Sequence, residues 1–246
     1  MQKFLLGTLF IVMGFLEPVI MATQTVLVTG ANRGMGLEYV KQFKAKGYDV
    51  IGTARKLEQA TELKKLDVTV VQLDVTDADS VAAMAKQLDG KVIDILINNA
   101  GYLNRSDSTL DTVDFDVMER TLAINTMGPL RVIKALMPNL QKGERKTVIN
   151  VSSQLGSIEN SRGGLYSYRA SKTALNQINK ILSEEYKDAG FIFTVVHPGW
   201  VQTDMGGPNA TYTIEQSITN LLKVIEGLTT KDNGKFYDLN GKILPW

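Results

Sequence analysis

Short runs of β-branched and other apolar residues alternate with longer stretches of helical period along most of this 246-residue chain. Such alternation is typical of βαβ units, whose parallel strands join into one sheet. Because the strand candidates carry nearly continuous Val, Ile and Leu, we expect helices on both faces of the sheet. The strand candidates are Thr25–Thr29, Tyr48–Thr53, Val68–Leu73, Ile93–Ile97, Thr147–Val151, Phe191–Val196 and Lys235–Leu239. The helix candidates are Met35–Lys46, Leu57–Lys65, Asp77–Leu88, Asp114–Met137, Tyr166–Asp188 and Thr213–Leu228.

Right-handed crossovers between these strands predict a single-domain α/β fold, a doubly wound parallel sheet of the Rossmann type. Residues 23–246 would form this domain. Sheets of this type bind ligands beyond the carboxyl ends of their strands, so we expect the functional residues directly after each strand.

The first 22 residues do not follow this alternation and are expected to lie outside the fold. Residues 4–16 carry no charge, and this run is shorter than the ~20 residues that span a bilayer. Three interpretations stay open: a signal peptide cleaved after Ala22, a membrane-associating anchor formed by residues 1–16, or a natural start at Met21.

Composition excludes several classes of function. The chain has no cysteine and a single histidine, His197, which excludes disulfides, Cys nucleophiles and a His/Cys zinc site; we expect no metal. The balance of 27 basic against 26 acidic residues gives no basic excess, so we expect no nucleic-acid partner. No Gly-x-Ser-x-Gly elbow accompanies His197, which favours a structural role for it.

A glycine-rich turn, Thr29–Gly36, lies between the first predicted strand and the first helix. Gly30 permits a tight turn, while Gly34 and Gly36 let a pyrophosphate and the sheet approach the backbone. The helix N-terminus then offers N–H groups to phosphate. We therefore predict a dinucleotide site, with a purely structural left-handed turn as the alternative.

The end of the second predicted strand indicates which dinucleotide would bind. It reads Thr53-Ala54-Arg55 and lacks the acid that binds the ribose 2′-OH of NAD. Arg33 and Arg55 are suited to a 2′-phosphate, so we predict NADP(H). The alternative is that both arginines are solvated surface charges.

Tyr168 and Lys172 are spaced i, i+4 on a predicted helix, which places a phenol and an ammonium on one face. A nearby cation stabilises a phenolate and lowers the tyrosine pKa, so this pair can exchange a proton with a carbonyl or alcohol oxygen. The alternative is an ordinary exposed helix pair.

Several motifs occur together in order and spacing. They are Thr29–Gly36, Asn98-Asn99-Ala100-Gly101, Asn125, Ser152-Ser153, Tyr168 with Lys172, and Pro198-Gly199. On these residues the chain resembles the short-chain dehydrogenase/reductase family from about Thr25 to its C-terminus. A narrower likeness, to C-factor- and sniffer-type carbonyl reductases, rests on residues 152–158, 164–176 and 238–246.

The resemblance implies a catalytic set. Tyr168 would be the general acid in carbonyl reduction, and Lys172 would lower its pKa and hold the nicotinamide ribose. Ser153 would hydrogen-bond the substrate oxygen, and Asn125 would hold a water that links Lys172 to solvent. Ser153 lies two residues farther from Tyr168 than the common family spacing, so Ser152 stays open as its alternative.

The resemblance also implies contacts to the cofactor. Asp74 would meet the adenine, although it could instead cap a turn before Asp77, and Asn98-Asn99 could instead tie strand ends together. The full predicted cofactor set is Gly30, Asn32, Arg33, Gly34, Met35, Gly36, Arg55, Asp74, Val75, Asn99, Ala100, Gly101, Tyr168, Lys172, Pro198, Gly199, Val201 and Thr203.

The segment Trp200–Tyr212 is short and contains Gly206-Gly207-Pro208, so we expect a mobile lid over an open pocket. Its apolar walls would come from Tyr102, Leu103, Leu155, Trp200 and Met205.

We therefore expect an NADPH-dependent oxidoreductase that reduces a small aldehyde or ketone to an alcohol. The alternative is a dinucleotide-binding signalling or regulatory protein of the C-factor type. NADPH as reductant favours a cytoplasmic location, with membrane attachment through residues 1–16 left open. The resemblance further implies a homodimer or homotetramer.

Overall fold

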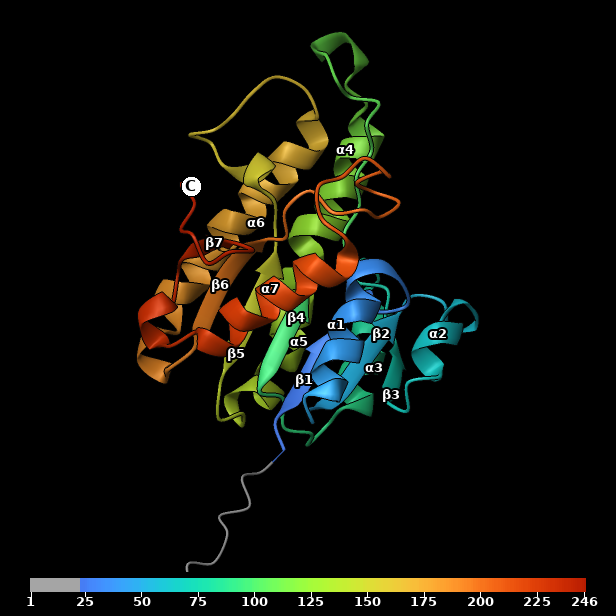
Figure 1. Ribbon diagram of the computed structural model, residues 1–246, viewed down its shortest axis with the longest axis vertical. Coiled ribbons are helices and arrows are strands. Elements are labelled where there is room, and N and C mark those ends of the chain that lie inside the picture. Colours follow the sequence, from blue (N-terminus) through green and yellow to red (C-terminus); the bar gives the residue numbers. More distant parts are fainter. Residues whose placement is uncertain (1–22) are drawn as a thin grey trace, which may run out of the picture.

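A computed structural model describes residues 23–246. They form a parallel sheet in the order β3-β2-β1-β4-β5-β6-β7, with helices packed on it (Figure 1). Because the chain runs outward in both directions from β1 and β4, the predicted doubly wound Rossmann-type sheet is confirmed. The strands are β1 (Thr25–Val28), β2 (Asp49–Ala54), β3 (Thr69–Gln72), β4 (Ile95–Asn98), β5 (Thr147–Val151), β6 (Ile192–His197) and β7 (Phe236–Asp238). The division of the chain at residue 22 stays a prediction, since residues 1–22 lie outside the described part.

The helices cover both faces of the sheet, as the nearly continuous apolar strands predict (Figure 1). They are α1 (Gly34–Ala45), α2 (Thr61–Lys64), α3 (Ala78–Gln87), α4 (Phe115–Leu122), α5 (Gly128–Gln141), α6 (Tyr166–Glu185) and α7 (Ile214–Gly227). Buried side chains of α1, α2 and α7 share one apolar cluster. Those of α3, α5 and α6 share a second cluster on the opposite face.

Strand alternation divides the core between these two clusters. In β1, Val26 and Val28 face the cluster of α1 and α7, whereas Leu27 faces that of α3 and α5. The register keeps this alternation across the sheet, since Val26 pairs with both Val50 and Ile95. A slip by one residue would turn every one of these side chains to the other face.

Two predicted helices differ from the observed ones. The predicted helix Leu57–Lys65 is divided at Ala60 into the 3-10 turn η1 (Leu57–Gln59) and α2. The predicted helix Asp114–Met137 contains a π-helical turn, η3 (Ala123–Met127), and continues through Pro138 to Gln141. Burial of Leu136 and Leu140 against the sheet holds this last turn together in spite of the proline.

Within residues 23–246, no helix is both long and apolar enough to cross a membrane. The expected anchor in residues 1–16 lies outside the described residues.

The loops that follow β4, β5 and β6 gather at the upper end of the sheet in Figure 1, where they appear in green, yellow and orange. This end carries the carboxyl ends of the parallel strands. It is therefore the edge at which a ligand of this fold is expected to bind.

Candidate active site

The glycine-rich turn after β1 is packed too closely for larger residues. Gly30 adopts φ +64°, and a Cβ on it would lie 3.0 Å from the Cα of Ala100. A Cβ on Gly36 would collide with the carbonyl oxygen of Gly30 and lie 2.6 Å from Nδ2 of Asn99. That amide donates to the carbonyls of Thr29 at 2.9 Å and Gly30 at 3.2 Å. Asn99 therefore fixes the turn through its side chain, while Asn98 ties β4 to Asn150 of β5 at 2.9 Å.

The N-terminus of α1 is open to a phosphate. Arg33 precedes the helix in extended conformation and supplies no side-chain cap, which leaves first-turn N–H groups without a partner from the capping residue. A Cβ on Gly34 would meet nothing within 4 Å. Backbone donors beside free space fit a pyrophosphate, so the residues of this turn suit a dinucleotide.

The two arginines of the predicted 2′-phosphate site are placed differently. The guanidinium of Arg33 forms an ion pair with Asp204 in the segment after β6. Arg55 is exposed, and it is close enough to Asp74 for its charge to lower the pKa of that carboxyl group. Burial raises the pKa of Asp74, but hydrogen bonds from Thr76 and the charge of Arg55 outweigh it, and the pKa lies below its usual value.

Asp74 caps a turn, the alternative considered for it. Its Oδ1 accepts hydrogen bonds from the backbone N–H of Thr76 at 2.9 Å and from the hydroxyl of Thr76 at 2.7 Å. Its contact with adenine stays a prediction. The predicted cofactor residues Asn32 and Met35 lie in the glycine-rich turn and the first turn of α1, and Val75 is buried directly after Asp74.

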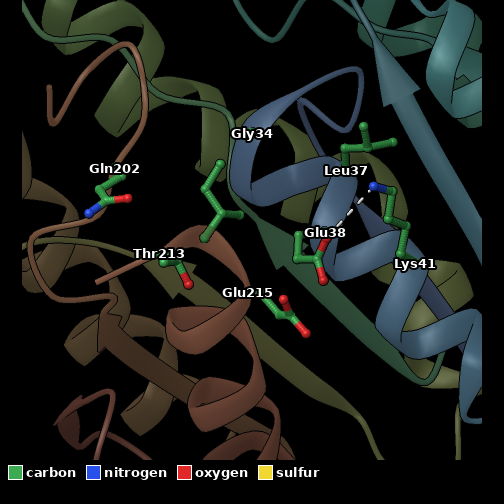
Figure 2. Close-up of a pocket in the computed structure, with 8 residues that line it drawn as sticks. Gly34, Leu37, Glu38, Lys41, Gln202, Thr213 and Glu215 are labelled. Atoms are coloured by element: carbon green, nitrogen blue, oxygen red, sulfur yellow. Dashed lines mark ion pairs between the residues drawn. The ribbon is translucent and has the colours of Figure 1, made fainter. Parts of the chain in front are cut away.

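A pocket of about 450 Å³ opens between the N-termini of α1 and α7 (Figure 2). Gly34, Leu37, Glu38 and Lys41 line it from α1. It borders the glycine-rich turn, but Asn125, Ser153, Tyr168 and Lys172 do not line it. The candidate reaction centre is therefore described by the contacts of these four residues and not by this pocket.

Asn125 lies in the π-helical turn η3 and is fully buried. Its Oδ1 accepts from the backbone N–H of Tyr102 at 2.8 Å, and its Nδ2 donates to the carbonyl of Tyr102 at 2.8 Å. Nδ2 also donates to Oγ of Ser171 at 3.0 Å. The side chain thus joins the loop after β4 to α6. π-turns frequently occur at functional sites.

Tyr168 is buried and lies beside Ser153. Burial raises the pKa of Tyr168 to about 12, while a hydrogen bond with the Ser153 side chain and the charge of Arg105 pull it down. Ser152 instead faces the carbonyl of Lys172, with its hydroxyl 3.5 Å from that oxygen. These contacts favour Ser153 over Ser152 as the partner of the phenol.

Lys172 lies one helical turn beyond Tyr168, with Nζ 5.8 Å from the centroid of the phenol ring. Nζ donates to the carbonyl of Val151 at 2.9 Å, and burial lowers the pKa of this lysine to about 8. A Cβ on Gly101 would lie 3.9 Å from this nitrogen and 3.6 Å from Oδ1 of Asn125. Gly101 therefore leaves space beside both groups. Arg105 contributes a charge that lowers the pKa of Tyr168, and the expected influence of Lys172 on the phenolate stays a prediction.

Sequence reasoning missed Asp107, which positions the helix that carries Tyr168. The helix begins after Leu165, which has φ +54° and supplies no side-chain cap. The fully buried Asp107 replaces that cap, because its Oδ2 accepts from the backbone N–H of Ser167 at 2.6 Å. Asp107 and Ser167 lie 60 residues apart, so no local pattern could reveal this contact.

The segment after β6 is anchored rather than free. Gly199 has φ +83°, and Val201 forms an isolated bridge with Tyr212 that closes the base of the loop. Inside it, the hydroxyl of Thr203 accepts from the backbone N–H of Gly206 at 3.0 Å. Pro198 accepts from the hydroxyl of Ser217 in α7 at 2.7 Å. These contacts hold the base and the interior of the segment, and its mobility over the pocket stays a prediction.

The only histidine of the sequence, His197, is buried at the end of β6. Burial lowers its pKa to about 4, although the charge of Asp238 opposes this shift. A neutral buried imidazole at pH 7 agrees with the structural role predicted for it.

The model of the family described as short chain dehydrogenase matches residues 24–212. The chain belongs to this family. Among curated relatives, it is 44% identical over 155 residues to the C-signal protein of Myxococcus xanthus, an alignment that covers 63% of this chain and 93% of that protein.

Two solved structures extend the comparison. The NADPH-bound carbonyl reductase from chicken fatty liver is 36% identical and has a TM-score of 0.84, with 91% of this chain and 99% of that chain covered. The carbonyl reductase Sniffer of D. melanogaster is 33% identical and has a TM-score of 0.87, with 91% and 100% covered. The recognised family and the Rossmann-type fold are thus confirmed.

Proposed function

We propose that this protein reduces an aldehyde or ketone to the corresponding alcohol with NADPH as reductant. The observation that carries this proposal is the grouping of Tyr168, Ser153 and Lys172 at the carboxyl ends of the strands, beside the space left by Gly101. The chain is an oxidoreductase of a family whose solved members include an NADPH-bound carbonyl reductase.

The residues of the site divide the work of proton transfer. When bound, NADPH would supply the hydride that reduces the carbonyl carbon. Ser153 orients the carbonyl oxygen and stabilises the negative charge that develops on it. Tyr168, whose raised pKa keeps the phenol protonated at pH 7, donates its proton to that oxygen, and the alcohol results. Solvent then returns a proton to the phenolate.

Lys172 and Asn125 support this transfer. The ammonium of Lys172 stabilises the phenolate left behind and would bind the nicotinamide ribose. Both ends of the Asn125 amide are bonded to Tyr102 or Ser171, so the side chain holds the loop and α6 in place. The amide oxygen accepts one of the two hydrogen bonds that it can take, so the water that we expect Asn125 to bind has an acceptor in this side chain or in its backbone.

The residues that would hold the dinucleotide are those of the predicted cofactor set. The turn from Gly30 to Gly36 and the N-terminus of α1 would bind the pyrophosphate, and Asn99 to Gly101 would face the adenosine ribose. Arg33 and Arg55 would pair with the 2′-phosphate. If the purified protein used NADH and NADPH with comparable kcat/KM, this role of the arginines would be wrong.

The test is NADPH consumption against a panel of aldehydes and ketones, with Tyr168→Phe as the variant. Removing the phenol hydroxyl is expected to lower kcat about 10²–10⁴-fold, the usual contribution of a general acid. NADPH binding, followed by cofactor fluorescence, should persist. Unchanged turnover in Tyr168→Phe would remove this residue from the mechanism.

A second candidate function is a dinucleotide-binding signalling or regulatory role, which the likeness to the C-signal protein favours. It predicts cofactor binding without turnover across the panel. It also predicts a protein partner whose binding changes when NADPH is added. Reduction of several carbonyl compounds at kcat values typical of enzymes, about 1 s⁻¹ or more, would argue against it.

We also propose a cytoplasmic location, where NADPH is available, and a homodimer or homotetramer. Fractionation of native cells with intact-mass measurement would test the first and distinguish the three interpretations of residues 1–22. Analytical ultracentrifugation would test the second.

A further inference from the structure

The loop after β4 is held directly against the start of the helix that carries Tyr168. Asp107 accepts from the backbone N–H of Ser167 through its side chain at 2.6 Å, and from that of Tyr166 through its carbonyl at 3.3 Å. The hydroxyl of Ser108 donates to the carbonyl of Arg105 at 3.0 Å. These bonds hold the loop that carries Arg105 against the start of the helix that carries Tyr168.

The exposed guanidinium of Arg105 contacts the segment after β6. Its Nη2 donates to the carbonyl of Met205 at 3.0 Å. Its charge acts on the hydroxyl of Tyr168, whose pKa burial raises and Arg105 lowers. A guanidinium has five N–H donors, and one bond to Met205 leaves most of them free to bind a ligand.

In the described part of the chain, Arg105 has no carboxylate partner. Within residues 23–246, no acidic side chain lies at ion-pair distance from Arg105. Asp204, next to Met205 in the sequence, is paired with Arg33. A second cation, Arg120, lies 4.8 Å from the ring centroid of Tyr102, a predicted wall of the substrate pocket. Two guanidinium groups, those of Arg105 and Arg120, therefore lie near the loop after β4.

We propose that Arg105 is a specificity-determining residue that binds a carboxylate on the carbonyl substrate while the carbonyl oxygen faces Tyr168 and Ser153. A planar guanidinium matches a carboxylate in a bidentate geometry. The loop that carries Arg105 is fixed to α6 through Asp107, so the backbone of this loop is held relative to the helix that carries the proton donor. This inference rests on the proposed reductase function.

The test compares aldehydes of the same framework that carry either a carboxylate or an uncharged ester. The substrates are 3- and 4-carboxybenzaldehyde and their methyl esters, with NADPH as reductant. The measured quantity is the ratio of kcat/KM for each acid to that for its ester, which cancels effects common to both substrates. In Arg105→Gln this ratio should fall about tenfold for the acid of better fit, because a charge-assisted hydrogen-bonded pair is lost.

Two further variants separate a specific contact from a general field. Arg105→Lys should keep part of the preference, since it retains the charge without the fork geometry. Lys86→Gln removes one positive charge from the exposed surface of α3 and should leave the ratio unchanged. An equal fall in Arg105→Gln and Lys86→Gln, or no fall in Arg105→Gln, would overturn the proposal.

Binding measurements make the test independent of turnover. Titration of the NADP⁺-loaded protein with 3- and 4-carboxybenzaldehyde should give a Kd about tenfold weaker in Arg105→Gln, as expected for a charge-assisted contact. If the wild-type protein bound the acids through Arg105 but reduced neither acids nor esters, the reductase function would be wrong and the anion site would stand. If it reduced acids and esters equally and Arg105→Gln changed no ratio, only the anion site would be wrong.

Discussion

The turn after β1 and the loop after β4 lie at the same edge of the sheet but are held in shape by different contacts. In the turn after β1, Gly30 and Gly36 remove side chains so that backbone packs on backbone. The loop after β4 is tied to distant elements by side chains, from Asn125 of η3 to the backbone of Tyr102 and from Asp107 to the backbone of Ser167. The first region can therefore be recognised from a short glycine motif, although Asn99 also holds it, whereas the second depends on distant contacts without such a motif.

Gly36→Ala should disrupt the turn after β1 and have the largest effect of these changes on stability. The added Cβ would collide with the carbonyl of Gly30, and the neighbouring backbone cannot move away easily. We expect a loss of about 3 kcal/mol in the free energy of unfolding, as for severe overpacking, measured by urea denaturation. NADPH binding should weaken strongly in the same variant.

The matched control is Gly227→Ala at the end of α7, where an added Cβ meets nothing within 4 Å. Its stability should stay within about 0.5 kcal/mol of the wild type. A similar small change for Gly36→Ala would show that the turn is not closely packed.

Asp107→Ala should break the second region. It removes a buried cap from α6, and we expect a loss of about 2 kcal/mol in the free energy of unfolding together with a lower kcat. Asp114→Ala removes an exposed cap from α4, where the side chain accepts from the backbone of Asp116 and Val117. This control should cost about 1 kcal/mol and leave kcat unchanged. If Asp107→Ala and Asp114→Ala changed kcat equally, the positioning role of Asp107 would be wrong.

The pH dependence of carbonyl reduction tests the role proposed for Lys172, which lies on the helix that Asp107 caps. Burial lowers its pKa to about 8, so the ammonium loses its proton as pH rises through that value and no longer stabilises the phenolate. We expect kcat/KM to be about tenfold lower at pH 9 than on its plateau near pH 7. The Lys172→Arg variant should turn over more slowly, but its guanidinium stays charged over the whole pH range, so its kcat/KM should show no such decline. A wild-type decline centred near the ordinary lysine pKa would contradict the influence of burial.

The ion pair between Arg33 and Asp204 links the turn after β1 to the segment after β6, and breaking it should have the smallest effect. Asp204 competes with a 2′-phosphate for Arg33. Asp204→Asn should therefore lower the KM for NADPH about two- to threefold, the scale of an exposed ion pair, without changing that for NADH. Asp188→Asn, an exposed acid in the 3-10 turn after α6, is the control. An equal change for both cofactors would exclude competition at Arg33.

The sequence predicts the sheet well because β-branched runs such as Thr147–Val151 bury completely between two helix layers. It also predicts which motifs meet, since parallel strands bring Gly30, Asn99 and Ser153 to one edge. It does not predict the π-turn at Asn125 or the helix through Pro138, because tertiary packing overrides local preference there. Asp107 and Arg105 carry no local signal, for their partners lie far away in the chain.

The cap that Asp107 provides allows substrate selectivity to change independently of the position of the proton donor. In many enzymes these two properties are difficult to vary separately. At one end the loop is tied to Asn125 through Tyr102, and at the other to α6 through Asp107. Residues 103–106 lie between these two ties. Exchanging them would alter which molecules are accepted while the proton donor stays in place. This short stretch is thus the natural target for redesigning selectivity without rebuilding the catalytic helix.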